Sequence, residues 1–192
     1  MTGEEITKLF WESVKDNIDF KESADLVKKN SNGGGVWLIG GFLYQNIAVQ
    51  LYGLEEQKAK DIDFIVENPA DKIAFPNNWK EKTTSYNNPK FIRNDGLIVD
   101  LVPLKEVNSI VRRNLPAIIE NYLTGVPLNI QSIVFDINNN RVFGDIGIKA
   151  LLDKTVAINN LEEAMVTSEH KKKPIQQIIK EKAEALGFLP LF

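Results

Sequence analysis

An apolar segment that carries two acids at alternate positions constrains the fold of this chain more than any other feature. The segment Asp61–Val66 reads Asp-Ile-Asp-Phe-Ile-Val, which is typical of a buried β-strand that begins with acidic residues. Because residues i and i+2 of a strand point to the same side, Asp61 and Asp63 are expected to project together. Two adjacent carboxylates repel each other unless a cation lies between them, so the pair is a candidate Mg²⁺ site. Taken alone, such a pair is more often a solvated strand end.

A pair of glycines follows an earlier apolar segment. Val36–Ile39 predicts a buried strand, and Gly40 and Gly41 after it leave backbone that a phosphate can approach without meeting a Cβ atom. The next segment, Phe42–Tyr52, has apolar residues at helical spacing. The first N–H groups of this helix would therefore point toward a bound triphosphate.

A third acid lies in another apolar segment. Asp100 interrupts Leu97–Val102, where a carboxylate is costly to bury without a partner or a metal. The preceding Lys90–Arg93 and the turn at Asn94-Asp95-Gly96 predict a hairpin that brings Asp100 alongside the Asp61–Val66 strand. The order of these elements along the chain predicts a metal-dependent nucleotidyl-transfer site.

Composition limits the class of protein. The chain has 192 residues, of which 43% are hydrophobic and 26% charged, and this suits one domain with a core, with or without a small appendage. It has no cysteine, so neither a disulfide framework nor a thiolate zinc site is expected. No segment is apolar enough to cross a membrane, and the N-terminus is acidic, so we expect a cytoplasmic protein without a membrane partner. The net charge of −3 argues against a strongly basic nucleic-acid binder, although a local basic face remains compatible with it.

The remaining elements are predicted from caps and periodicity. A helix begins at the capping box Thr2-Gly3-Glu4-Glu5, and residues 68–88 lack a clear period, with Trp79 and Tyr86 expected to pack a surface excursion. We divide the chain into an N-terminal helical segment, residues 1–35, and a main domain, residues 36–192. Further helices are predicted near 22–29, 107–113, 116–123 (with Pro116 in the first turn), 146–153, 161–167 and 175–186, and further strands at 130–136, 141–143 and 155–158.

These motifs resemble the nucleotidyltransferase superfamily of DNA polymerase β. They are most similar to the head domain of poly(A) polymerases and CCA-adding tRNA nucleotidyltransferases, in which a strand ending in Gly-Gly is followed by an Asp-x-Asp strand and a third carboxylate. The resemblance covers residues 36–188 and extends through Ser132–Asp136 and Val142–Asp145. It implies an α+β nucleotidyltransferase fold, in which a mixed β-sheet is flanked by helices.

The chain also departs from the pattern of this family. Tyr44 and Gln45 stand where the family usually has Arg-Asp, and Gly125–Asn129 replaces its Arg-Arg-Asp-Phe-Thr stretch. Gln176, Gln177 and lysines replace arginines of the exit helix. The chain stops where the family's neck, body and tail would begin, so we do not expect it to add CCA to tRNA by itself.

The resemblance assigns roles to individual residues. Asp61 and Asp63 would hold two Mg²⁺ ions, and Asp100 would be a ligand of the ion that activates the acceptor hydroxyl. The residues expected to contact the nucleotide are Gly40, Gly41, Lys60, Arg112 and Arg113. For Lys60 a solvated side chain, and for the two arginines surface salt bridges, are the alternative roles. His170 is expected to have no catalytic role, and Lys171–Lys173 is expected to be solvated or to touch RNA phosphate.

The function implied is an Mg²⁺-dependent enzyme that transfers NMP from an NTP such as ATP to a hydroxyl of an RNA 3′ end, a protein or a small molecule. Its expected partners are the NTP and either an RNA with a tRNA-like 3′ end or a partner protein. One alternative is a catalytically inactive protein of the same fold that binds a nucleotide or a partner. Another is a toxin-like enzyme that modifies tRNA ends.

Overall fold

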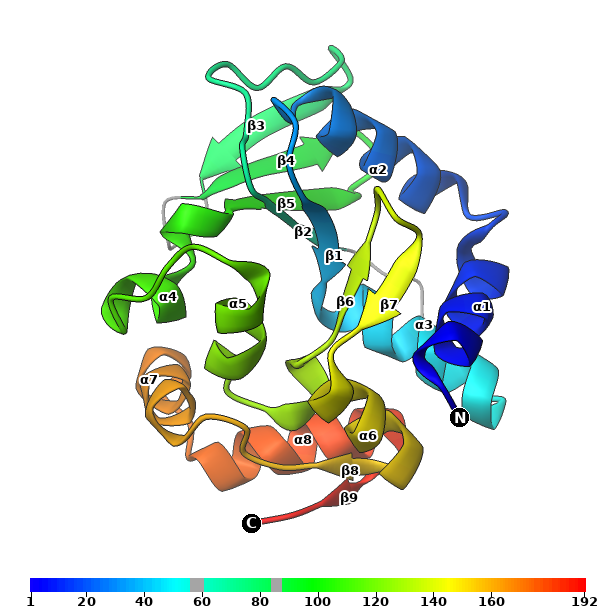
Figure 1. Ribbon diagram of the computed structural model, residues 1–192, viewed down its shortest axis with the longest axis vertical. Helices are drawn as coiled ribbons and strands as arrows, with labels where there is room; N and C mark the ends of the chain where they lie inside the picture. Colours follow the sequence, from blue (N-terminus) through cyan, green and yellow to red (C-terminus); the bar gives the residue numbers. More distant parts are fainter. Residues whose placement is uncertain (56–60, 84–87) are drawn as a thin grey trace.

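A mixed β-sheet forms the centre of the computed structural model, which describes residues 1–55, 61–83 and 88–192 (Figure 1). Within these residues the sheet has seven strands in the order β3-β4-β5-β2-β1-β6-β7. Only β2 and β5 run parallel, while the other neighbours pair antiparallel. The strands are β1 Val36–Ile39, β2 Asp61–Val66, β3 Trp79–Thr83, β4 Pro89–Arg93, β5 Ile98–Pro103, β6 Val134–Asp136 and β7 Arg141–Phe143.

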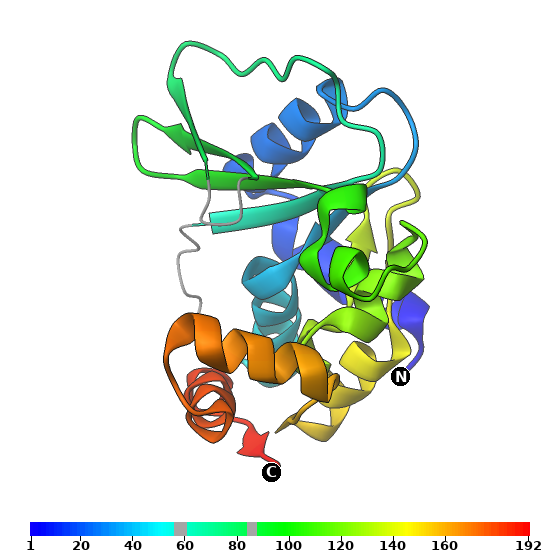
Figure 2. The same ribbon diagram turned by 90° about the vertical axis from the view of Figure 1, so that its left-hand side faces the viewer.

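Helices cover the sheet and extend beyond one of its ends. In both views α7 and α8 lie at the opposite end of the molecule from α2 and the β3–β4 hairpin (Figures 1 and 2). Two short parallel strands, β8 (Thr155–Val156) and β9 (Leu189–Pro190), pair beside α8. The helices are α1 Gly3–Val14, α2 Ile18–Lys29, α3 Gly40–Tyr52, α4 Asn108–Arg112, α5 Ile119–Gly125, α6 Asp145–Asp153, α7 Leu161–Lys171 and α8 Ile175–Leu186, with 3₁₀ turns at Leu104–Glu106 and Asn129–Gln131.

The alternation of side chains along β2 separates two cores. Ile62 and Phe64 belong to the larger core, which includes residues from α1, α2 and α3. Ile65 belongs to a smaller core that includes residues from α4 and α5. Because Asp61 and Asp63 are four and two residues from Ile65, they share the sheet face of the smaller core. The period of the strand therefore places the acids on the sheet face of the smaller core rather than on the face of the larger core.

Most elements predicted from the sequence are confirmed, and several boundaries are wrong. The hairpin of β4 and β5 is present, the capping box of α1 forms, and Gly187 ends α8 in the left-handed region. The helix predicted near 22–29 begins at Ile18, because Asn17 caps it by accepting a hydrogen bond from the N–H of Phe20. Pro116 is not in a first helical turn, since α5 begins at Ile119.

Two predicted segments also differ in kind. The strand predicted over 130–136 is only Val134–Asp136, because a 3₁₀ turn occupies Asn129–Gln131. The segment without a clear period contains β3, and Trp79 in it is buried in the larger core rather than packed on the surface. β3 was not predicted because its residues alternate in charge and only Trp79 among them is buried, so the segment has no apolar period. Tyr86 lies outside the described residues.

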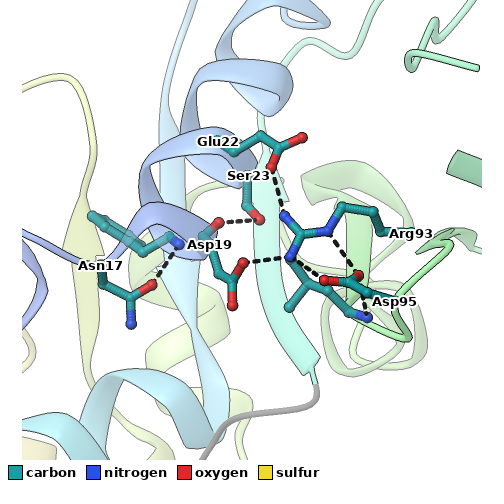
Figure 3. A network of polar contacts seen from close by, with 8 residues as sticks. Asn17, Asp19, Glu22, Ser23, Arg93 and Asp95 are labelled. Carbon is teal, nitrogen blue, oxygen red and sulfur yellow. Dashed lines mark hydrogen bonds and ion pairs between the residues drawn. The ribbon is translucent and has the colours of Figure 1, made fainter. Parts of the chain in front are cut away.

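A cluster of charged side chains fastens α2 to the β4–β5 hairpin (Figure 3). The Arg93 guanidinium donates to Asp19 Oδ1 at 2.5 Å, to Glu22 Oε2 at 2.5 Å and to both carboxylate oxygens of Asp95 at 2.6 and 2.8 Å. It also lies 5.7 Å from the centre of the Trp79 ring. We call these residues the Arg93 cluster. Its cation is surrounded by acids, so every charge in it has a partner.

Among the described residues, none of the helices is both long and apolar enough to cross a membrane.

Candidate active site

Two of the predicted acids lie side by side on neighbouring parallel strands. Asp63 of β2 is the register partner of Asp100 of β5, so their backbones are separated by about 4.8 Å, the usual spacing between strands. Asp61 lies two residues earlier on the same face, opposite Ile98, and is exposed. The hairpin predicted from the sequence therefore does bring Asp100 beside the Asp-x-Asp strand. Asp63 and Asp100 are together called the acid pair below.

The electrostatics of the acid pair are unfavourable in the absence of a bound cation. Burial, together with the nearby charges of Asp100 and Asp61, raises the pKa of Asp63 to about 7. Burial also raises the pKa of Asp100, and Lys90 opposes this shift. Lys90 Nζ lies 3.5 Å from Asp100 Oδ2, whereas Asp100 Oδ1 is buried and has no hydrogen-bond partner among the described residues. An ionised acid in this position needs a further positive group.

Gly40 lies against the acid pair on the side of β1. It follows β1 directly, has a φ of +75°, and begins α3. A Cβ atom at this position would lie 2.5 Å from Asp63 Oδ2, so only glycine brings the backbone this close to the carboxylate. Gly41 differs, because a Cβ there would meet its nearest described neighbour, Tyr44 Oη, at an ordinary 3.7 Å. Gly40 is therefore required by the geometry of the site itself.

The start of α3 lies beside this carboxylate. No side chain caps the N-terminus of α3, whose capping position is Ile39. Ile39 is also the register partner of Asp63 on β1. The positive end of a 13-residue helix is thus placed next to the acid pair without a side-chain acceptor for its first N–H groups.

A lysine from the end of the chain reaches the same place. Lys182 Nζ of α8 donates a 2.8 Å hydrogen bond to Tyr44 Oη of α3, and it lowers the pKa of Asp63. Tyr44 is buried, and Tyr122 of α5 packs nearby with a pKa raised by burial and by the charges of Asp63 and Tyr44. Tyr44, which stands where the resembled family has arginine, therefore holds a cation in place instead of supplying one.

Lys90 and Lys182 lie at the site but were not among the site residues predicted from the sequence. The register of the predicted hairpin places Lys90 opposite Asp100, so the pattern contained the signal for this residue. Lys182 and Tyr44 are 138 residues apart, and no local pattern brings them together.

The two predicted arginines are engaged with other groups. Arg112 forms a salt bridge with Glu163, a buried acid of α7, so it has the salt-bridge role given as its alternative. Arg113 Nη1 donates to Thr124 Oγ1 at 3.4 Å. These contacts connect α4 to α7 and to α5. Lys60, the other predicted nucleotide contact, lies outside the described residues.

The acid pair has the donor chemistry for Mg²⁺. Hard divalent cations prefer carboxylate oxygens, and Asp100 supplies a buried oxygen that has no protein partner. Within the described residues, no three acidic, histidine or cysteine side chains are gathered closely enough to hold a metal ion, so the three predicted acids do not form a complete ligand set by themselves. Asp61, at the exposed start of β2, lies close enough for its charge to raise the pKa of both Asp63 and Asp100. The residues present fit a cation that keeps water or phosphate as its other ligands.

Comparison with known proteins places the fold. The chain matches no protein-family model, and no curated protein matches its sequence. A CCA-adding enzyme solved with ATP aligns over 96% of this chain and 41% of its own, at 16% identity and a TM-score of 0.61. A CCA-adding enzyme with CTP and the Thermotoga maritima CCA-adding enzyme complexed with tRNA each align over 81% of this chain at 18% identity, with TM-scores of 0.56 and 0.55.

These likenesses confirm the predicted fold class. The chain has the α+β nucleotidyltransferase fold, a mixed sheet flanked by helices, and the structures it resembles are those of CCA-adding enzymes. It spans 37% and 36% of the lengths of the CTP- and tRNA-bound enzymes.

Proposed function

We propose that this protein is an Mg²⁺-dependent nucleotidyltransferase that transfers NMP from an NTP to a hydroxyl group. The observation that carries the proposal is the acid pair: Asp63 and Asp100 are side by side, partly buried and insufficiently neutralised, with Gly40 against one carboxylate. The solved structures of similar fold include complexes with CTP and ATP, which supports an NTP as the donor. A scaffold has no structural need to bury these acids together.

Different residues around the acid pair would bind the triphosphate and the acceptor hydroxyl. Gly40 and the start of α3 would receive the triphosphate, because the backbone is bare there and the helix end is positive. Lys182, held by Tyr44, would face the same phosphates. Asp100 Oδ1, which has no donor among the described residues, would be a ligand of the metal or would accept a hydrogen bond from the acceptor hydroxyl.

Asp61, Asp63 and Asp100 would hold the metal. When bound, Mg²⁺ neutralises charge on the phosphates and lowers the pKa of the attacking hydroxyl. The protein contributes orientation, since β2 and β5 fix the two inner carboxylates in register before substrate arrives.

Calorimetric titration with each NTP, in the presence and absence of Mg²⁺, tests the donor side of the proposal. The wild-type protein is expected to bind at least one NTP in a metal-dependent manner, and the Asp61→Ala/Asp63→Ala variant is expected to lose this binding. Nucleotide binding that ignores both metal and substitution would support the inactive nucleotide-binding alternative instead.

Label transfer tests the reaction itself. Each of the four α-labelled NTPs is incubated with RNA, protein and metabolite fractions, and label is expected in one fraction only when Mg²⁺ is present. Asp100→Asn serves as the matched inactive variant, because it keeps the size of the side chain and removes its charge. Equal label with wild type and Asp100→Asn would contradict the proposed role of Asp100.

A further inference from the structure

A pocket between α3 and α8 lies outside the candidate active site. Its volume is about 190 Å³. Gln45 and Val49, about one turn apart, line it from α3, and Ala185 and Leu186 line it from the last turn of α8. Neither aspartate of the acid pair is among the described residues that line it. The pocket is therefore a feature of the molecule that the proposed reaction does not use.

Both helices end at this pocket. Tyr44 of α3 and Lys182 of α8 meet in a hydrogen bond, and from that bond each helix continues past the pocket toward its C-terminus. Gly53 caps the end of α3, and Glu55, two residues later, lines the pocket. Gly187 caps the end of α8 and lines the pocket too. Two helix C-termini consequently meet at the end of the pocket that lies away from the bond between Tyr44 and Lys182.

This end of the pocket is electronegative. The last carbonyl groups of an α-helix have no partner within the helix, and they carry its partial negative charge. The carboxylate of Glu55 adds a full negative charge at the same end. No lysine or arginine is among the described residues that line the pocket. A positively charged group is therefore favoured here.

The walls of the pocket are apolar. Val49 and Leu54 are partly buried, and Leu186 is buried in the larger core. A cavity of about 150 Å³ holds a single aromatic ring, so this pocket has room for a ring with a short side chain. The apolar walls and the electronegative end together suit a small molecule that has an apolar body and one cationic group.

We propose that this pocket binds a small organic cation, namely a primary amine whose apolar body is about the size of one ring. The ammonium group would lie at Glu55 and the two helix ends, and the apolar body against Val49 and Leu186. This inference goes beyond the proposed function, because it concerns a second site and does not depend on nucleotidyl transfer. The alternative is a solvated Glu55 beside a water-filled hollow, and a matched pair of ligands distinguishes the two.

Benzylamine and benzyl alcohol form such a pair, because they have the same shape and only benzylamine is charged near pH 7. Each is titrated into the isotope-labelled full chain, in EDTA and without nucleotide, and the backbone amide NMR signals are followed. Benzylamine is expected to bind with a Kd of about 1 mM, an ordinary value for a ligand of about eight non-hydrogen atoms. Benzyl alcohol should bind about tenfold more weakly, because it gains nothing from Glu55 or from the helix ends. The largest shifts should be those of Val49, Glu55 and Ala185.

Two substitutions test the charge and the space separately. Glu55→Gln keeps the size of the side chain, and it should weaken benzylamine binding about fivefold and leave benzyl alcohol binding unchanged. Ala185→Trp fills the pocket from an exposed helix position and should abolish binding of both ligands. Glu184→Gln is the matched control, since Glu184 is an exposed acid of the same helix end that pairs with Lys180. Thermal unfolding establishes that all three variants remain folded.

The inference is overturned by equal affinities for the two ligands, by wild-type benzylamine affinity in Glu55→Gln, or by the absence of shifts at about 10 mM of either ligand. Equal losses in Glu55→Gln and Glu184→Gln would also overturn it, because they would reflect net charge alone. Displacement of benzylamine by ATP with Mg²⁺ would place the pocket within the nucleotide site and contradict a separate site. Losses confined to Glu55→Gln and Ala185→Trp support the inference whether or not label transfer occurs.

Discussion

The Arg93 cluster and the acid pair both bring carboxylates together beside the central sheet, and they are arranged in opposite ways. In the Arg93 cluster three acids surround one guanidinium, whose pKa is raised chiefly by its hydrogen bonds to Asp95. In the acid pair, burial raises the pKa of both carboxyl groups, and Lys90 at 3.5 Å is the one cation within salt-bridge distance among the described residues.

We infer a different role for each group from this difference. The Arg93 cluster is complete in the protein alone and fastens α2 to the hairpin (Figure 3). The acid pair is incomplete within the described residues, because Asp100 Oδ1 has no partner there and Asp63 lies against the backbone of Gly40. Natural proteins keep such unfavourable groups where a ligand completes them, at some cost in stability. The comparison makes predictions in which the same kind of substitution has opposite effects in the two regions.

The largest expected effect is on catalysis. Asp63→Asn removes the charge that would hold the metal and should reduce label transfer by about 10³-fold. Asp95→Asn, the same change in the Arg93 cluster, should leave transfer near the wild-type rate at a temperature where the variant is folded. Initial rates with saturating α-labelled NTP measure both, and similar losses in the two variants would remove the distinction between the regions.

The second largest effect is on stability. Arg93→Ala leaves Asp19, Glu22 and Asp95 without their shared cation and should lower the free energy of unfolding by about 2 kcal/mol, a value reduced by the partial exposure of the acids. Arg93→Lys should recover only part of the loss, because a single ammonium cannot replace a planar group with several donors. Urea unfolding measures the free energy of unfolding of both variants. A wild-type value for Arg93→Ala would show that the cluster does not stabilise the contact between α2 and the β4–β5 hairpin.

A smaller effect is expected for Lys182, the lysine of α8 whose charge lies near the acid pair. Lys182→Met keeps the length of the side chain but removes the charge beside Tyr44, so the KM for NTP should rise about tenfold, equivalent to about 1.4 kcal/mol of lost binding. Lys180→Met is the control, since Lys180 is exposed and pairs with Glu184 on the outside of the same helix. Equal KM values in the two variants would exclude Lys182 from the phosphate site.

The smallest effect concerns pH and differs in sign between the two regions. The pKa of Asp63 is raised to about 7 in the folded protein, above about 3.9 in the unfolded chain, so the stability this proton provides is present below pH 4 and is lost as pH rises through 7. Asp63→Asn should therefore stabilise the metal-free protein by about 1 kcal/mol near pH 8 and have little effect near pH 4.

Asp95 should behave in the reverse way. The hydrogen bonds from Arg93 lower its pKa to about 2, so its contribution to stability is present above pH 4 and is lost as pH falls through 2. Asp95→Asn should destabilise the protein near pH 8. Thermal unfolding of the two variants across this pH range, in EDTA, compares them directly, and a shift of the same sign for both would contradict the contrast.

Much of the site was predictable from local patterns. The alternation in Asp61–Val66, the hairpin that ends in Leu97–Val102 and the glycines after Val36–Ile39 together predicted the strands, the position of Asp100 and the fold. These features are encoded by spacing within a strand or turn, which the sequence displays directly.

The remaining features depend on contacts between distant segments. Lys182 meets Tyr44 only because α8 packs beside α3, and Arg112 is occupied only because α7 presents a buried Glu163. β3 was missed because it is an edge strand whose alternating charges gave no apolar period. Such features follow from tertiary packing, which a single sequence does not display.

The measurement that tests the central claim most directly is the effect of Mg²⁺ on thermal unfolding near pH 8. If the acid pair is a metal-binding site, millimolar Mg²⁺ should raise the Tm of wild type and of Asp95→Asn by the same amount, and should leave the Tm of Asp63→Asn unchanged. Ca²⁺ and a matched concentration of NaCl control for ion size and ionic strength. A Tm that rises equally in all three proteins, or in none, would contradict the assignment of Asp63 and Asp100 as a metal-binding site.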